Sequence, residues 1–311
     1  MSNAADVTTF EAPPPGRPRR GGRSYSYEVK SGGHRSRPLT PHQPSHSQTW
    51  GWRHSLTLTT PSIELLCGSF DRTPAHYNGQ VDLIFTSPPY NIGSKSPRID
   101  GKRKNGKYDP KSYGGITGYA DSLPEDQYQD EQVAFLQWCL LMLKDDGVLV
   151  YNHKPRRKNM GMIHPMQWLL RVPQLQLMEE IIWDRGSTHN HANRLFWPQT
   201  ERLYVFRKAD GAYRFQNTAD MEFRSDVWKI PLSSRQATDA GHACPFDGTL
   251  ASSVINAFTA PGDLVCDPYS GSGTTMCAAQ AMGRSFVGTE ISKVYHRQSI
   301  ERLQMQRTEV A

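Results

Sequence analysis

The chain has 311 residues, enough for one large domain or two smaller ones, and 37% of the residues are hydrophobic. Its formal net charge of +6 and its pI of about 9.0 favour a polyanionic partner. No apolar run reaches the roughly 20 residues of a membrane span, and the first residues lack the apolar core of a signal peptide. Membrane insertion and export are therefore not expected.

The chain contains five cysteines, an odd number at wide spacing and without a Cys-x-x-Cys pair. This pattern disfavours a disulfide scaffold and a zinc module. It predicts a reducing compartment, which we take to be the cytoplasm. The cysteines are Cys67, Cys139, Cys244, Cys266 and Cys277.

Residues 1–55 differ in composition from the rest of the chain. They are rich in Pro, Gly, Ser and His, and residues 1–50 hold seven Lys or Arg against three Asp or Glu. A segment with so few aliphatic side chains cannot offset its ordering entropy by packing, so we expect a disordered basic arm over 1–55. It is either a solvated tail, with Ser2-Asn3-Ala4 as a cloning remnant, or an electrostatic tether to nucleic acid. Residues 56–311 then form one folded domain.

From Ser62 onward, predicted strands and helices alternate along the chain. This rhythm predicts an α/β fold with a mostly parallel sheet and helices on both faces. Short apolar runs bounded by turn residues predict strands over 63–67, 81–85, 148–151, 178–183, 203–206, 264–266 and 285–288. Apolar residues at helical spacing predict helices over 126–143, ending at Asp146-Gly147, then over 250–258 and 274–282, and from Ser292 on.

A glycine-rich turn lies between a predicted strand and a predicted helix, where open α/β sheets bind nucleotides. Its sequence is Asp267-Pro268-Tyr269-Ser270-Gly271-Ser272-Gly273-Thr274-Thr275. It is not a phosphate loop, because no Gly-Lys-Ser/Thr follows. Glu290 ends the next strand, at the distance where an acid binds ribose hydroxyls. The glycine-rich turn and Glu290 together fit an adenosyl ligand that lacks a pyrophosphate. The alternative is that the turn has only a structural role.

A second motif, Thr86-Ser87-Pro88-Pro89-Tyr90, directly follows the predicted strand 81–85. Two prolines fix the backbone and remove two N–H donors, so carbonyl oxygens are held beside a hydroxyl and an aromatic ring. Such a group offers acceptors to an amino group and a surface on which a planar base can stack.

Together the two motifs resemble those of the S-adenosylmethionine-dependent DNA amino-methyltransferases. The catalytic motif precedes the cofactor loop, which is the circularly permuted order of that family's β group, so the resemblance implies a Rossmann-like methyltransferase fold over residues 62 to about 300. It extends to His242-Ala243-Cys244-Pro245-Phe246, where the family places a Phe against the adenine. The chain departs from the family at Ser69, where an acid is common, and Asp71 is the residue that could replace it.

The resemblance implies site-specific methyl transfer from S-adenosylmethionine to an exocyclic amine of a base flipped out of DNA, without a covalent intermediate. The hydroxyl of Ser87 and the carbonyl of Pro88 would hold the amine, and Tyr90 would stack on the base. The implied catalytic residues are Ser87, Pro88, Pro89 and Tyr90. The implied cofactor residues are Phe246, Asp267, Ser270, Gly271, Ser272, Gly273, Thr274, Thr275 and Glu290.

The motifs leave two choices for the nitrogen that is methylated. Ser before Pro-Pro-Tyr resembles the N4-cytosine enzymes, which we favour, whereas N6-adenine enzymes usually carry Asp or Asn there. Methylation at a ring carbon is excluded, because it needs a cysteine nucleophile in a Pro-Cys pair and the chain has only the reversed Cys244-Pro245. A second alternative is an inactive methyltransferase fold that only binds DNA.

We expect DNA contacts from target-recognition insertions near 94–120, 186–197 and 213–241, although a solvated loop is the plain alternative for the first. Seven basic residues against two acids follow the catalytic motif, Lys111 being the last. The expected DNA-binding residues are Lys95, Arg98, Lys102, Arg103, Lys104, Lys107, His189, His191 and Arg194. No metal is expected, because His189 and His191 lack a third ligand.

Three further expectations concern individual side chains and partners. The basic cluster Lys154, Arg156, Arg157 and Lys158 could bind backbone phosphates. Trp183 and Trp197 are expected in the core or in a pocket wall. Double-stranded DNA is the expected partner, with a nucleoid-associated location, and a second copy of the chain and a cognate restriction endonuclease are partners to consider beside it.

Overall fold

The computed structural model describes residues 61–92, 122–158, 161–188, 196–215, 223–231 and 248–310. By its internal contacts the chain divides into two units, Met1–Ser55 and Leu56–Ala311, and all described residues belong to the second. The expected basic arm lies outside the described residues, as do most of the three expected insertions.

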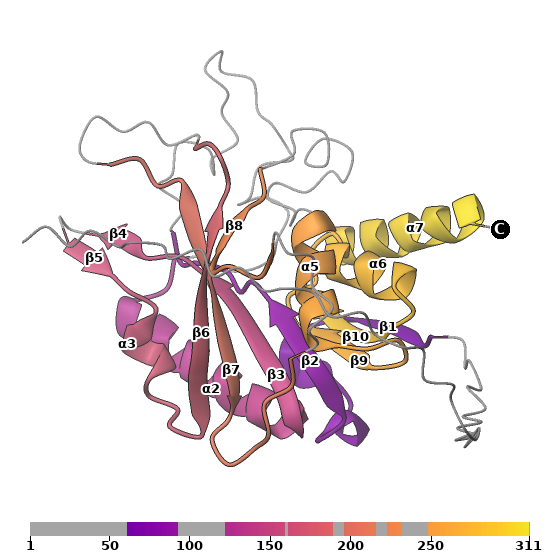
Figure 1. Ribbon diagram of the computed structural model, residues 1–311, viewed down its shortest axis with the longest axis horizontal. Coiled ribbons are helices and arrows are strands. Elements are labelled where there is room, and N and C mark those ends of the chain that lie inside the picture. Colours follow the sequence, from indigo (N-terminus) through magenta and orange to yellow (C-terminus); the bar gives the residue numbers. More distant parts are fainter. Residues whose placement is uncertain are drawn as a thin grey trace, which may run out of the picture. The chain divides into compact units, whose positions relative to one another are not determined.

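The centre of this unit is an eight-stranded sheet with the order β1-β10-β9-β2-β3-β7-β6-β8 (Figure 1). All neighbouring strands are parallel except that β7 is antiparallel to β3 and β6. The mostly parallel sheet is therefore confirmed. The strands are β1 (Ile63–Cys67), β2 (Val81–Thr86), β3 (Leu143–His153), β6 (Leu175–Asp184), β7 (Thr200–Lys208), β8 (Val227–Lys229), β9 (Leu264–Asp267) and β10 (Ser285–Glu290).

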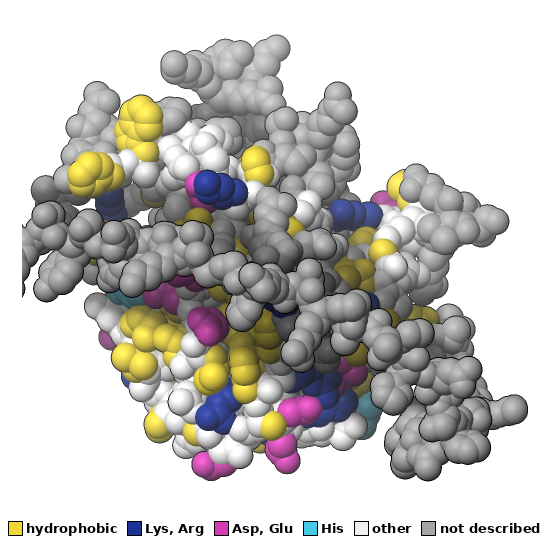
Figure 2. All heavy atoms as spheres, viewed as in Figure 1, with side chains coloured by type: hydrophobic (Ala, Val, Ile, Leu, Met, Phe, Trp, Pro, Cys, Tyr) yellow, Lys and Arg dark blue, Asp and Glu magenta, His cyan; other side chains and the backbone are white. Residues whose placement is uncertain are grey.

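The two edges of the sheet differ. Because β7 is antiparallel, its first residues lie at the same edge as the last residues of the other strands. Both motifs follow strands that end at this carboxyl edge, after β2 and after β9. Toward the opposite edge, where β2 and β3 begin, acidic and basic side chains lie among apolar and other polar ones on the lower part of the face shown in Figure 2.

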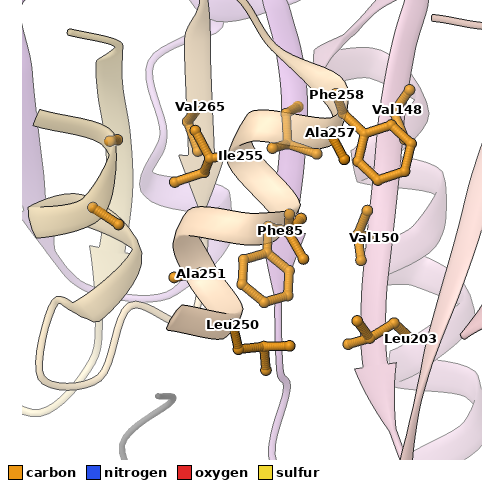
Figure 3. Close-up of a cluster of buried hydrophobic side chains, with 14 of the residues drawn as sticks. Phe85, Val148, Val150, Leu203, Leu250, Ala251, Ile255, Ala257, Phe258 and Val265 are labelled. Carbon is orange, nitrogen blue, oxygen red and sulfur yellow. The ribbon is translucent and has the colours of Figure 1, made fainter. Parts of the chain in front are cut away.

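Helices cover both faces of the sheet. The helices α2 (Glu125–Met142) and α3 (Met166–Leu169) pack on one face, and α5 (Gly248–Phe258), α6 (Thr274–Ala281) and α7 (Lys293–Val310) lie on the other. Successive side chains of β2 point to opposite faces of the sheet. Leu83 and Phe85 join the hydrophobic cluster under α5, while Ile84 joins the cluster under α2. Figure 3 shows Phe85 packed against α5 and β3. Among the described residues, no helix is both long and apolar enough to cross a bilayer.

Every predicted strand and helix is present, and the differences from the sequence expectations are local. Asp146-Gly147 lies inside β3 and does not end α2, which stops at Met142. Gly147 is needed there for packing, because a Cβ would come within 2.8 Å of the Val81 carbonyl oxygen on β2. The structure also contains α3, β8 and a small hairpin, β4 (Arg156–Lys158) and β5 (Gly161–Ile163), which were not predicted from the sequence. These elements have only three or four residues, too few for a periodic pattern.

The strand order places a topological switch point between β9 and β2. From β9 the chain continues through α6 to β10 on one side, and from β2 it continues through α2 to β3 on the other. Open α/β sheets bind ligands in the crevice at the carboxyl ends of two such strands. The glycine turn follows β9 and the Ser-Pro-Pro-Tyr motif follows β2, so the fold brings both motifs to this crevice.

Candidate active site

Asp267, the last residue of β9, joins the two motifs. Its carboxylate accepts hydrogen bonds from the hydroxyl of Thr86 at 2.9 Å and from the hydroxyl of Thr275 at 2.8 Å. The backbone N–H of Tyr269 donates to it at 3.2 Å. Burial raises the pKa of Asp267 to about 6, although these three donors favour the charged form. Its carboxylate therefore fixes the start of the glycine turn to the end of β2.

The glycine turn has a backbone that requires glycine at two positions. Gly271 and Gly273 have φ angles of 53° and 76°, in the left-handed region. A Cβ on Gly273 would also lie 3.0 Å from the side chain of Ser299 on α7. The hydroxyl of Ser299 in turn donates to the carbonyl of Gly271 at 2.8 Å. The turn is thus held between β9 and α7, with Gly273 buried against Ser299 and Gly271 partly exposed.

Glu290 lies against this turn, as the sequence predicted from its position at a strand end. Its carboxylate accepts the backbone N–H of Gly271 at 2.8 Å and that of Ser292 at 2.7 Å. Burial raises its pKa to about 7 against the effect of these two donors. The buried hydroxyl of Ser270 has no hydrogen-bond partner within the described part of the chain. A carboxylate and an unused hydroxyl at the end of a strand fit the hydroxyl groups of a bound nucleoside.

Ser87 and Tyr90 belong to a hydrogen-bond network at the neighbouring strand ends. The Ser87 hydroxyl donates to the Tyr90 hydroxyl at 3.0 Å, and the Tyr90 hydroxyl donates to Glu201 Oε2 at 2.9 Å. Asn152 Nδ2 donates to Tyr90 at 3.0 Å and to Glu201 at 3.2 Å. Asn152 is near the end of β3 and Glu201 near the start of β7, so three strands converge on the tyrosine.

Glu201 is a buried carboxylate that stays charged. Burial would raise its pKa, but Lys154 and Arg185, with hydrogen bonds from Tyr90 and Asn152, outweigh burial and lower it. Arg185 Nη1 lies 2.9 Å and Lys154 Nζ lies 3.3 Å from Glu201 Oε1. The two cations therefore bind one carboxylate oxygen, and Tyr90 and Asn152 bind the other.

The second proline of the motif is supported by an aromatic cluster. Tyr128 of α2 donates its hydroxyl to the Pro89 carbonyl at 2.9 Å and lies 2.8 Å from His153 Nε2. Burial holds the pKa of His153 well below its usual range, so the ring is neutral. The His153 ring lies 4.3 Å from the Tyr90 ring, centre to centre. These contacts fix the ring of Tyr90 and the backbone of the motif together.

Asn91 brings together the two ends of residues 92–122. It has a φ of 52°, which Asn tolerates better than most residues. Its side chain accepts the backbone N–H of Leu123 at 2.8 Å and donates to the Leu123 carbonyl at 3.0 Å. The chain therefore leaves the catalytic motif and returns to α2 at the same place. Residues 93–121 themselves lie outside the described residues.

Part of this arrangement was predictable from the sequence. Ser87, Tyr90, Thr275, Glu290 and the loop from Asp267 to Gly273 meet at the switch point, as expected. Three polar residues of the network were not predicted, because no motif marks them: Asn152, Arg185 and Glu201. The sequence clue that could have indicated them is a polar residue next to the apolar positions of a predicted strand. Ten predicted residues lie outside the described residues: Lys95, Arg98, Lys102, Arg103, Lys104, Lys107, His189, His191, Arg194 and Phe246.

Two residues of the basic cluster after β3 have ionic partners within the protein, and Trp197 lies outside the core. In the basic cluster after β3, Arg156 is 6% exposed and binds Glu125 at 2.6 and 3.0 Å, while Lys154 binds Glu201. These two cations pair with the partly buried Glu125 and the buried Glu201. Arg157 and Lys158 are exposed, so phosphate binding by the cluster stays a prediction. Trp183 is buried in the core as expected, but Trp197 is 60% exposed. Trp197 lies in the segment that precedes β7, outside the core.

Comparisons with known proteins agree with this geometry. A family model described as DNA methylase matches residues 81–301. The DNA adenine methyltransferase YhdJ of Escherichia coli K12 is 26% identical over 251 residues, covering 72% of this chain and 76% of that protein. The type II methyltransferase M2.LlaDCHI of Lactococcus lactis subsp. cremoris is 24% identical over 232 residues, covering 72% and 82%.

Solved structures share the fold. The cytosine-N4-specific PvuII DNA methyltransferase aligns with a TM-score of 0.59 at 19% identity, covering 81% of this chain and 93% of that one. TTHA0409 of Thermus thermophilus, a DNA modification methylase solved with S-adenosyl-L-methionine, aligns with a TM-score of 0.56 at 21% identity, covering 78% and 94%. The expected Rossmann-like methyltransferase fold is therefore confirmed.

Proposed function

We propose that this chain, which belongs to the DNA methylase family of N6-adenine and N4-cytosine methyltransferases, methylates the exocyclic N4 of cytosine in DNA with S-adenosylmethionine as methyl donor. The observation that carries the choice of base is the neutral Ser87 hydroxyl in front of Pro88-Pro89-Tyr90, at the switch point beside the glycine turn. N6 of adenine is the second candidate, because the relative YhdJ is named an adenine methyltransferase.

The glycine turn is proposed to hold the methyl donor. Glu290 and the hydroxyl of Ser270 are placed to accept and donate hydrogen bonds to its ribose, and Gly271, which is only partly buried, lets it approach the backbone. Asp267, Ser272, Thr274 and Thr275 shape this loop, and Phe246 is proposed to cover the adenine. When bound, the donor supplies a methyl group activated by a sulfonium.

Ser87, Pro88 and Tyr90 are proposed to hold the target base. An exocyclic amine conjugated with a ring is a poor nucleophile, so its N–H groups must be held by acceptors that localise the nitrogen lone pair. The Ser87 hydroxyl and the Pro88 carbonyl are those acceptors, and catalysis is then mostly positioning. The Tyr90 hydroxyl is held by hydrogen bonds to Glu201 and Asn152, and its ring offers the surface on which the extruded base stacks.

The exposed rim of the site is proposed to face DNA. Arg157 on β4 is exposed and donates to the Phe196 carbonyl at 3.0 Å, and the side chain of Phe196 is 90% exposed beside Trp197. Cations bind phosphates, and exposed aromatic rings stack on bases or fill space in the duplex. The residues after the catalytic motif (Lys95 to Lys107) and His189, His191 and Arg194 are proposed to extend this rim.

Nucleoside analysis tests the proposed function. The chain is incubated with unmethylated duplex DNA and labelled S-adenosylmethionine, and the DNA is digested to nucleosides for mass spectrometry. We expect labelled N4-methylcytosine. Labelled N6-methyladenine would overturn the choice of base but not the methyltransferase. DNA that is bound but carries no label would support the inactive DNA-binding alternative. The Ser87→Ala variant serves as the control for a contaminating activity.

The pKa of Glu290 predicts a pH dependence of cofactor binding. The ribose hydroxyls and the sulfonium charge favour the ionised carboxylate, but burial raises the pKa of Glu290 to about 7. Binding therefore releases a proton below that pH, and affinity rises with pH. We expect the dissociation constant of S-adenosylmethionine, measured by calorimetry, to fall about tenfold between about pH 6 and pH 8. Glu290→Gln should bind more weakly at pH 8 and lose this dependence; an unchanged affinity would exclude the ribose role.

A further inference from the structure

We infer that Glu201 is the terminal acceptor of the proton that the target amine loses, and that this proton travels through Ser87 and Tyr90. The inference rests on the proposed function, since it concerns the same reaction. It is carried by the direction of the hydrogen bonds in the network, by the burial of Glu201 and by the two cations that keep it charged.

The reaction needs a proton acceptor. The nitrogen lone pair forms a bond to the methyl carbon, the carbon–sulfur bond breaks, and its electron pair returns to sulfur. The positive charge is then on the nitrogen, which must release one proton to become a neutral secondary amine. A ring-conjugated nitrogen in this state is a far stronger acid than a carboxylic acid, so even a carboxylate with a lowered pKa can accept the proton.

The hydrogen bonds form a path in one direction. The amine N–H donates to Ser87 Oγ, the Ser87 hydroxyl donates to Tyr90 at 3.0 Å, and the Tyr90 hydroxyl donates to Glu201 Oε2 at 2.9 Å. When each donor passes its proton on, both hydroxyl groups end as neutral as they began and Glu201 becomes a carboxylic acid. The steps balance without any other reactant.

Asn152 fixes this direction. Its Nδ2 donates to the Tyr90 hydroxyl oxygen at 3.0 Å and to Glu201 Oε2 at 3.2 Å. The tyrosine oxygen therefore receives hydrogen bonds from Ser87 and Asn152, and its own hydrogen is directed to the carboxylate. Asn152 is 1% and Glu201 6% exposed, so water does not compete for the contact between these two side chains.

The proton can leave Glu201 on the side of the carboxylate that faces away from Tyr90. Its other oxygen, Oε1, is bound by Arg185 and Lys154, whose side chains are 12% and 29% exposed. The paired cations return Glu201 to the charged form, and the proton leaves to water beside Lys154. The carboxylate is then ready for the next turnover.

The test combines removal of Glu201 with rescue by a small carboxylate. Single-turnover methylation is measured on DNA that the wild-type chain methylates, for Glu201→Ala, Glu201→Gln and Tyr90→Phe. We expect each variant to be about tenfold slower, and the double variant Tyr90→Phe/Glu201→Ala to be no slower than either single one. Added formate, which can occupy the space left in Glu201→Ala, should restore that variant but neither of the two variants that carry Tyr90→Phe.

Glu180→Ala is the matched control, since Glu180 is a carboxylate on the neighbouring strand β6 that pairs with Arg202 away from Tyr90. It should methylate at the wild-type rate with and without formate. Cofactor affinity and melting temperature show that the Glu201 variants remain folded, and Glu201→Gln, which keeps the size of the side chain, replaces Glu201→Ala if the latter does not fold.

The two proposals fail in different ways. A Glu201→Ala variant as fast as the wild type, or formate rescue of Tyr90→Phe to the same extent, would overturn the proton path and leave the methyltransferase intact. Fully additive losses in the double variant would likewise overturn it. A wild-type chain that transfers no methyl group to any DNA would overturn the proposed function and the path with it.

Discussion

Ser87→Ala is expected to slow methylation of DNA by about 100-fold while the affinity for S-adenosylmethionine stays within about twofold of the wild type. The hydroxyl is the group proposed to localise the lone pair of the amine, and it is the first donor toward Tyr90. Cofactor contacts are proposed for the glycine turn after β9, a different strand, so they should be unaffected. Single-turnover kinetics measure the first quantity and calorimetry the second.

Ser285→Ala is the matched control for this substitution. Ser285 begins β10 at the opposite edge of the same sheet, where its hydroxyl accepts the backbone N–H of Ser62 at 3.3 Å. The Ser285→Ala substitution removes a serine hydroxyl far from both motifs, so the methylation rate should not change. Equal losses in the two variants would mean that Ser87 acts through stability and not through the target amine.

The elements of the fold were predictable because their apolar runs are long enough to show a period. The runs 81–85 and 264–266 mark buried strands, and the two motifs directly after them imply a shared carboxyl edge. The strand order was not predictable in the same way, since the antiparallel β7 and the position of β8 depend on pairing between distant segments. Gly147 shows the limit clearly: Asp-Gly looks like a turn, yet this glycine is needed for close packing of β2 and β3.

The candidate site was predictable only where a motif is local. Ser87 and Tyr90 are three residues apart, and Glu290 follows the glycine turn by one helix and one strand. Glu201 is 111 residues from its partner Tyr90, and nothing in its local sequence distinguishes it from a solvent-facing residue at a strand end. The ionic partners of Lys154 and Arg156 were not predictable for the same reason: cations that pair with a carboxylate of the protein look like cations that bind phosphate until their partners are known.

Arg214 points to a stability determinant at the opposite edge of the sheet. Its guanidinium binds Asp82 on β2 at 2.9 Å, Asp146 on β3 at 2.6 Å and Asp263 before β9 at 2.8 Å. Asp82 is 1% exposed and also accepts Lys144 Nζ at 2.8 Å and the backbone N–H of Leu264 at 2.9 Å. One cation thus joins the amino ends of the two strands that carry the catalytic motif and Asn152 to the turn that precedes the cofactor strand.

Removing this cation is expected to destabilise the chain strongly without changing the chemistry. Arg214→Ala leaves the buried Asp82 with Lys144 as its only ionic partner among the described residues, and breaking a buried ion pair typically costs about 3 kcal/mol or more. For a unit of this size we expect the melting temperature to fall by about 6–12 °C. Because both motifs lie at the other edge of the sheet, the single-turnover methylation rate well below the melting temperature should match that of the wild type.

Arg171→Ala separates this effect from the loss of any surface ion pair. Arg171 binds Asp130 at 2.6 Å, but the two side chains are 44% and 67% exposed, so its loss should cost less than about 1 kcal/mol. Asp82→Asn combined with Arg214→Ala gives a second check, because partners in one ion cluster must show a non-additive loss in a double-mutant cycle. Equal melting temperatures for Arg214→Ala and Arg171→Ala would show that the fold does not depend on the cluster. A lost methylation rate in a folded Arg214→Ala variant would show that this edge of the sheet is coupled to the catalytic edge.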